Sequence, residues 1–132
     1  MNDRFKFRVW WKCPYDKHKM LYDAEQTYDY MKGEPETIPE DCFCDLINND
    51  EYVLMQCTGL KDKNGKLIYE GDIIKDFYCK GVITWNQFSW TIKYLDKKNR
   101  YVLPYDANIT SWEIIGNIYE NKELLDESQI NN

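Results

Sequence analysis

Metal binding or nucleophilic catalysis would depend first on the cysteines and the single histidine of this chain. Five cysteines occur, and Cys42 and Cys44 form a C-x-C pair. Structural zinc sites usually combine C-x-x-C pairs with a second pair of cysteines or histidines, and a thiol nucleophile needs a partner base. His18 is the sole histidine for either role. We therefore expect reduced, largely buried thiols and no metal or cofactor, with zinc held by Cys42, Cys44 and His18 as the open alternative.

Acid–base chemistry would depend on Glu70 and Asp72, because residues two apart on a strand place both carboxylates on one face. Such a pair can catalyse proton transfer or hold a divalent cation. However, acidic side chains in exposed turns are common, and lysines lie nearby at positions 61, 63, 66 and 75. The sequence contains no glycine-rich phosphate loop. A Ser-His-Asp triad would have to use His18, because it is the single histidine. We therefore expect that the protein is not an enzyme.

Aromatic side chains are the unusual feature of the composition, at 16% of 132 residues, with 11 Tyr, 5 Trp and 5 Phe. Exposed aromatics beside basic residues on a small barrel can stack single-stranded bases. The candidate set is Trp85, Phe88, Trp90 and Tyr94 with Lys80, Lys93, Lys97 and Arg100. Alternation along residues 88–94 favours a different role, in which Phe88, Trp90, Ile92 and Tyr94 form a core face.

Charge is distributed unevenly along the chain, whose formal net charge is −6. Residues 1–20 carry +4, residues 21–51 carry −9, residues 52–112 carry +3 and residues 113–132 carry −4. The negative total argues against a general affinity for nucleic acids. The segments could be solvated faces of one domain, or the basic middle could bind an acidic partner or the acidic segment of a second copy.

Alternating apolar and polar residues between turn signals predict a series of short strands. An N-terminal hairpin is expected from residues 5–10 and 19–22, with Phe5, Phe7 and Val9 toward the core and Arg8 on the other face. Asn64-Gly65 is typical of a hairpin turn, and Lys80-Gly81 is expected to turn the chain. Further strands are expected over 51–58, bounded by Gly59, and over 67–69, 71–79, 82–85, 88–94, 101–103 and 111–119, with a helical turn over 122–126.

These elements predict a mainly β, β-rich α+β fold with a small SH3-like barrel in the C-terminal part. We expect three ranges: residues 1–51 as the hairpin plus an acidic, irregular or short-helical excursion, 52–126 as the barrel-like core, and 127–132 as a frayed tail. No apolar run approaches the roughly 20 residues of a membrane helix, and the first residues do not resemble a signal peptide. A cytoplasmic protein without membrane contact is therefore expected.

Residues 54–75 (LMQCTGLKDKNGKLIYEGDIIK) are similar to the central signature of the YopX family. The ending EIIGNIYEN over 113–121 with 123–125, the opening KFRVW over 6–10, and Lys19-Met20 resemble it as well. Two departures are Cys57, at a position where an aromatic residue is expected, and residues 42–45, which match no part of the family pattern. The resemblance implies a phage or prophage accessory protein with a β-rich C-terminal part that assembles from several identical chains, and it implies no particular reaction.

The signature consists of residues that form turns and bends, as expected of a motif that specifies a fold. Asn64-Gly65 supplies a turn, Gly71 a bend that the Asp72 carboxylate could brace, and Gly116 a bulge or a close backbone approach. The residues assigned to this fold signature are Gly59, Asn64, Gly65, Tyr69, Gly71, Asp72 and Gly116.

Many of the aromatic residues lie in or beside the N-terminal excursion, close to the reversal of charge. Exposed Tyr and Trp are typical of protein interfaces. The candidate interaction surface is therefore Trp10, Trp11, Tyr15, Tyr22, Tyr28 and Tyr30. We expect a non-enzymatic protein-binding module that forms homo-oligomers through the hairpin and residues 23–51, and that also binds a further protein. A barrel that binds single-stranded nucleic acid is the alternative.

Overall fold

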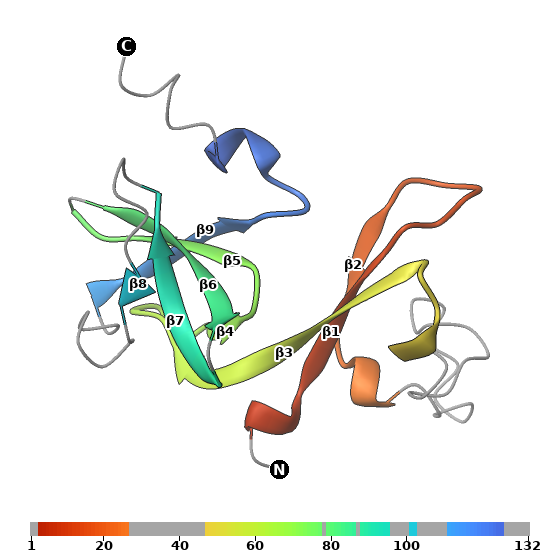
Figure 1. Cartoon of the computed structure of the whole chain (residues 1–132), viewed down its shortest axis with the longest axis horizontal. Coiled ribbons are helices and arrows are strands. Elements are labelled where there is room, and N and C mark those ends of the chain that lie inside the picture. The colour runs from red at the N-terminus through yellow and green to blue at the C-terminus, as the bar shows by residue number, and fades with distance from the viewer. Residues whose placement is uncertain are drawn as a thin grey trace. The chain divides into compact units, whose positions relative to one another are not determined.

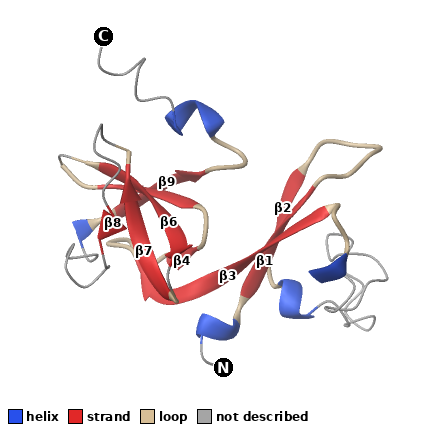
Figure 2. Cartoon of the chain, viewed as in Figure 1, coloured by secondary structure: helices blue, strands red, loops and turns tan. Residues whose placement is uncertain are grey.

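The computed structural model describes residues 3–26, 47–77, 79–86, 88–95, 101–102 and 111–125, and of residues 26, 101 and 102 only the backbone. Strands make up most of these residues, and the helical elements are short (Figures 1 and 2). The chain divides into two compact units, Met1–Cys57 and Thr58–Asn132. No described helix has the length and apolar character needed to cross a bilayer.

The N-terminal unit is built around strand β1 (Phe7–Trp11), which follows the 3-10 turn η1 (Asp3–Phe5). β1 pairs antiparallel with β2 (Lys19–Leu21) on one side and with the first part of β3 (Tyr52–Lys61) on the other. The expected hairpin is therefore present. Its apolar face joins the 3-10 turn η2 (Ala24–Gln26) in a core of Val9, Leu21 and Ala24, with Phe7, Trp11, Tyr52 and Leu54 packed against it.

Two predictions for this hairpin were wrong. Phe5 was expected in the core, but it lies in η1 and is 50% exposed, because the turn closed by the Lys6 N–H to the Asp3 carbonyl delays the strand until Phe7. Arg8 lies on the face opposite Val9, as predicted, but it is buried, whereas only the face of Val9 was expected to be buried. Its guanidinium lies near Tyr22, with Nη1 3.4 Å from the hydroxyl oxygen that accepts its hydrogen bond. A buried charged group needs such polar contacts.

The C-terminal unit begins with the second part of β3 and continues through β4 (Leu67–Tyr69), β5 (Asp72–Lys75), β6 (Lys80–Asn86) and β7 (Ser89–Tyr94). It ends with β8 (Tyr101–Val102), β9 (Glu113–Asn117) and the expected terminal turn η4 (Lys122–Leu125). The strand orders are β2-β1-β3-β4 and β8-β7-β6-β5-β9. The curled antiparallel strands form a half-barrel (Figure 1), which confirms the predicted mainly β fold class.

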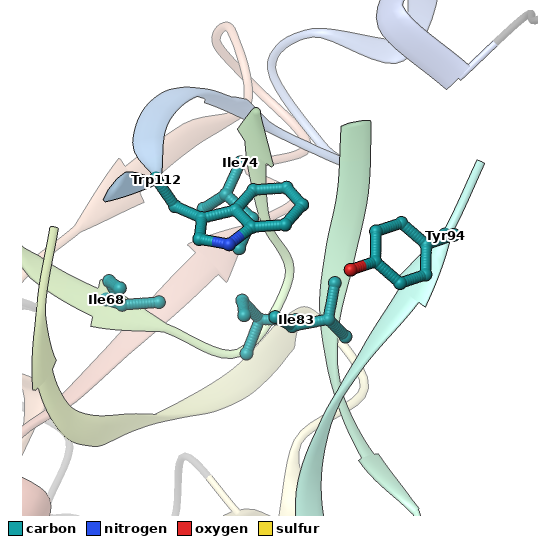
Figure 3. Packing of buried hydrophobic residues seen from close by; sticks show 6 residues of the cluster. Ile68, Ile74, Ile83, Tyr94 and Trp112 are labelled. Carbon is teal, nitrogen blue, oxygen red and sulfur yellow. The ribbon is translucent and has the colours of Figure 1, made fainter. Parts of the chain in front are cut away.

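The core of the half-barrel is a cluster of branched aliphatic side chains around one indole ring. Trp112, 1% exposed, lies among Ile68, Ile74 and Ile83, and its ring centroid is 5.8 Å from that of Tyr94 (Figure 3). Ile92 completes the buried set, and Trp90 packs against it while partly exposed. Side chains from β4, β5, β6 and β7 thus converge on the residue that precedes β9.

Three glycine and turn assignments were wrong in this unit. β3 does not end at Gly59, which has a φ of 83° within the strand and so permits a bend there. Gly81 lies inside β6 rather than in a turn, and glycine is needed there because a Cβ atom at that position would collide with the Cγ2 atom of Ile92. Phe88 lies in the turn before β7 at a φ of 65° and is 92% exposed, so it is not part of the core face.

The remaining predictions concern boundaries and segments that the structure does not test. The division between Cys57 and Thr58 falls within β3, whereas the sequence places a boundary before residue 52. The ranges 1–51, 52–126 and 127–132 therefore stay predictions about organisation. Most of the acidic excursion and the whole tail lie outside the described residues.

Candidate functional site

The fold-signature residues form hydrogen bonds and bends inside the C-terminal unit. Gly65 has a φ of 81° in the β3–β4 turn, and Gly71 has a φ of 87° before β5. The Tyr69 N–H donates to Asp72 Oδ2 at 2.8 Å, so this carboxylate braces the bend at Gly71. Opposite β5, the register shift between Ile73 and Ile74 places a β-bulge in β9 directly before Gly116. These roles are structural.

Asp62 is a structural residue that sequence reasoning missed, because it looked like an ordinary acid of a polar turn. Its Oδ1 atom accepts hydrogen bonds from the N–H groups of Asn64 and Lys66, both at 2.9 Å, and its Oδ2 atom accepts one from Ile114 at 3.0 Å. The Lys63 N–H also donates to the Trp112 carbonyl. The β3–β4 turn is thereby attached to the start of β9.

The ionisation of Asp62 reflects these contacts. Burial alone would raise the pKa of its carboxyl group, but three backbone N–H donors, helped by the positive charge of Lys66, lower the pKa below its ordinary value. Asp62 therefore stays ionised at neutral pH and holds the turn as an acceptor.

The predicted pair of carboxylates does not form an exposed site. Asp72 is 2% exposed and bonded to the backbone, whereas Glu70 lies in the turn before β5 and is half-buried. Among the described residues, no group of three or more His, Cys, Asp or Glu side chains is arranged to hold a metal ion. His18 is exposed, Cys13 and Cys57 are buried, and Cys79 is half-buried. Cys42 and Cys44 lie outside the described residues.

The predicted N-terminal surface is only partly brought together. Trp10 and Trp11 are consecutive residues of β1, so their side chains point to opposite faces. Trp11 packs on the unit's core and stacks on Tyr52, whereas Trp10 meets the exposed His18 edge-on with ring centroids 6.0 Å apart. Tyr15 and Tyr22 are 95% and 55% exposed. Tyr28 and Tyr30 lie outside the described residues.

A second group of exposed aromatics lies at the β6–β7 turn, which the sequence had assigned mainly to the core. Trp85 pairs with Trp90 across the two strands, and their rings meet edge to face with centroids 5.0 Å apart. Trp85 is 53% exposed and Phe88 is 92% exposed. We call Trp85, Phe88 and Trp90 the aromatic tip. The position at the end of a hairpin, beyond the buried Ile83–Ile92 pair, was the signal that could have revealed it.

Two of the basic residues proposed to accompany these aromatics, Lys80 and Lys93, lie on the other face of the hairpin. Trp85 shares its face with Ile83 and Gly81, and Trp90 shares it with Ile92 and Tyr94. Lys80 and Lys93 alternate with these residues and therefore point the opposite way. Tyr94 is itself buried, and Lys97 and Arg100 lie outside the described residues. The described members of the proposed nucleic-acid set therefore do not share one surface.

A surface pocket of about 320 Å³ lies elsewhere on the same unit. It is lined by Lys63, Lys75, Asp76, Phe77, Ser111 and Glu113. Its two cations and two anions offset each other, and Lys63 Nζ is 3.7 Å from Glu113 Oε2. This balance of charges favours no particular class of ligand.

Comparison with solved structures supports the fold. Protein EF1440 from Enterococcus faecalis is 31% identical, with a TM-score of 0.58, and the match covers 92% of this chain and 97% of that one. Protein yopX from Bacillus subtilis is 19% identical, with a TM-score of 0.53 and coverage of 93% and 97%, and shows likeness of fold alone. No curated protein matches the sequence.

The family comparison covers both units described above. The model described as YopX protein matches residues 6–126, from the residue before β1 to the residue after η4. This span includes the fold-signature glycines, Asp62 and the aromatic tip. The chain therefore belongs to the YopX family.

Proposed function

We propose that this protein is a non-enzymatic protein-binding module that assembles with copies of itself and binds a further protein. The observation that carries the proposal is the exposure of large aromatic side chains at turns of both units. Those assigned to binding are Phe5, Tyr15 and Tyr22 in the first unit and Trp85 and Phe88 in the second. Aromatic residues are enriched at the centres of protein interfaces, because they bury a large area at a small entropic cost.

A binding role rather than catalysis is supported by the use of the acidic residues. Asp62 and Asp72 are both buried, and each accepts hydrogen bonds from the backbone. They therefore hold the fold and are not directed at a substrate. The further proposal that the protein is an accessory protein of a phage or prophage, acting in the cytoplasm of the host cell, rests on the family resemblance.

The N-terminal unit is the proposed contact between copies. Tyr15 is nearly fully exposed in the β1–β2 loop, next to the basic residues of the hairpin and before the acidic segment of residues 21–51. Each copy therefore carries both a basic and an acidic segment, so the basic segment of one copy can attract the acidic segment of another.

Light scattering coupled to size-exclusion chromatography tests this proposal. A single chain has a mass of 16.0 kDa, and we expect a multiple of this mass at tens of micromolar. Tyr15→Ser should shift the population toward single chains, whereas Phe77→Ser, an exposed aromatic of the other unit, should not. A strict single-chain mass over the whole concentration range contradicts self-assembly.

Binding of single-stranded nucleic acid is the competing function, because exposed rings can stack on bases. It predicts a change of tryptophan fluorescence on titration with oligothymidylate or oligouridylate, and the change should weaken steeply with salt. The position of Lys80 and Lys93 on the face opposite Trp85 and Trp90 disfavours this alternative.

A further inference from the structure

The aromatic tip is built as a fixed surface rather than as a collection of loose side chains. Trp90 packs against the core cluster on one side and meets Trp85 edge-on, with ring planes 75° apart, on the other. Below the rings, the hydroxyl oxygens of Thr84 and Thr91 are 2.9 Å apart, and the Ser89 hydroxyl donates to the Asn86 carbonyl at 3.2 Å. The nearby polar side chains thus hold the hairpin and leave the rings available.

Phe88 is held in an unfavourable conformation that brings it no burial. Its φ of 65° lies in the left-handed region, which costs a residue with a Cβ atom about 1–2 kcal/mol, yet 92% of the side chain is exposed. An exposed ring in a strained backbone conformation contributes little to folding. Such outliers often mark a functional position.

The size of the tip argues against a second copy of the chain as its occupant. A buried aromatic side chain removes about 150–250 Å² from solvent, so Trp85 and Phe88, at their exposures, offer a few hundred Å². A stable interface between two folded chains needs about 800 Å² from each partner. The tip alone is therefore suited to a short segment of another protein.

The chemistry of the tip restricts that segment. Residues 84–91 (TWNQFSWT) contain no charged side chain, and Lys80 and Lys93 lie on the opposite face. Trp85 is 53% exposed, and its indole N–H is a hydrogen-bond donor that a ligand carbonyl could use. Flat apolar surfaces beside such a donor suit a proline-rich segment in the polyproline II conformation, which is already extended and has solvated carbonyls.

We propose that the aromatic tip of Trp85, Phe88 and Trp90 binds an uncharged, proline-rich segment of a partner protein. This inference rests on the proposed protein-binding function and names the class of partner for one surface. The proline rings would pack on the faces of Trp85, Trp90 and Phe88. The Trp85 indole would donate a hydrogen bond to a carbonyl of the segment.

The test is a titration of the full chain with a decaproline peptide, followed through the indole N–H signals in a nitrogen–proton NMR spectrum. The five tryptophans provide internal controls, because Trp10 and Trp11 belong to the first unit and Trp112 is buried in the core. We expect the Trp85 and Trp90 signals to move in a saturable manner, and a glycine-serine peptide of equal length to leave them unchanged. Trp85→Phe and Trp90→Phe identify the signals.

Matched variants separate the tip from exposed aromatics in general. Phe77 and Phe88 are both 92% exposed in turns of the same unit, so Phe88→Ser should weaken decaproline binding at least about fivefold and Phe77→Ser should leave it unchanged. An unchanged Trp112 signal in both variants verifies that the fold is intact.

The proposal is overturned if decaproline moves neither indole signal, if the glycine-serine peptide moves them equally, or if both Phe variants weaken binding to the same extent. It is also overturned if oligothymidylate saturates the tip and decaproline does not. None of these outcomes alters the oligomeric mass from light scattering. Failure at the tip is therefore distinguishable from failure of the proposed self-assembly.

Discussion

The β3–β4 turn and the β6–β7 turn belong to the same unit, but their side chains are used in opposite ways. In the β3–β4 turn, the Asp62 carboxylate accepts three backbone hydrogen bonds, and Gly65 adopts the positive φ that the turn requires. In the β6–β7 turn, Phe88 rather than glycine adopts a positive φ, and its ring is exposed. A residue type that is favourable for its backbone conformation indicates a structural role. A residue type that is unfavourable for its conformation is compatible with a binding role.

The largest effect is expected from the tryptophan beside the β3–β4 turn. Trp112→Ala should lower the free energy of unfolding by about 3–5 kcal/mol, because it empties the centre of the core and leaves a cavity. Trp85→Ala, at the other turn, should lower it by less than about 1 kcal/mol. Urea denaturation measures both values, and similar losses would remove the distinction between the two turns.

The next largest effect is expected at Asp62. Asp62→Ala leaves the N–H groups of Asn64, Lys66 and Ile114 without their acceptor and should cost about 2–3 kcal/mol. The matched change in the other turn is Ser89→Ala, which removes one hydrogen bond at 3.2 Å and should cost less than about 1 kcal/mol. Equal costs in denaturation experiments would show that Asp62 does not hold the turn to β9.

The pH dependence of stability sharpens the same point. Since the pKa of Asp62 is lower in the folded state than in the unfolded chain, its contribution is complete above the ordinary aspartate pKa of about 3.9 and is lost as the pH falls through the folded value. The difference in unfolding free energy between the natural chain and Asp62→Asn should therefore shrink in acid. A difference that stays constant into strong acid would contradict the role of the ionised carboxylate.

The smallest effect, and one of opposite sign, is expected at Phe88. Asn tolerates the left-handed region better than Phe, so Phe88→Asn should leave stability unchanged or raise it by up to about 1 kcal/mol while it weakens decaproline binding as Phe88→Ser does. Phe77→Asn serves as the control. The φ angle of Phe77 is not positive, so this change should bring no gain in stability. A clear loss of stability in thermal unfolding of Phe88→Asn would mean that Phe88 supports the fold.

Much of the fold could be predicted from the sequence, because strand periodicity and turn residues are local signals. The alternation around Val9 and Ile92 and the Asn64-Gly65 turn predicted the hairpins, and the family signature over residues 54–75 added the likeness that the comparisons confirm. Two of the errors fell where a local pattern continues past the element that it describes. Phe5 and Phe88 continue an alternation, but each lies in a turn outside the strand.

The candidate surfaces were harder to predict from the sequence, because the exposure of a side chain depends on where the core ends. Trp85 and Trp90 continue the face of Ile83 and Ile92, and only their position beside the hairpin turn indicates that the core stops before them. The same limit applies to Trp112, whose burial arises from strands distant in sequence. Lys80 and Lys93 were grouped with the aromatics by proximity in sequence, which ignores the alternation of strand faces.

The sequence by itself determined the mainly β class, the hairpins and the turn at Gly65, since these follow from the conformational preferences and spacing of neighbouring residues. Only the tertiary structure decided which carboxylates are buried acceptors and which rings are exposed. Both outcomes depend on contacts between residues far apart in the chain, as between Asp62 and Ile114 or between Trp112 and Ile68. The physical reason is that hydrogen bonding and burial are properties of the packed unit, not of local sequence.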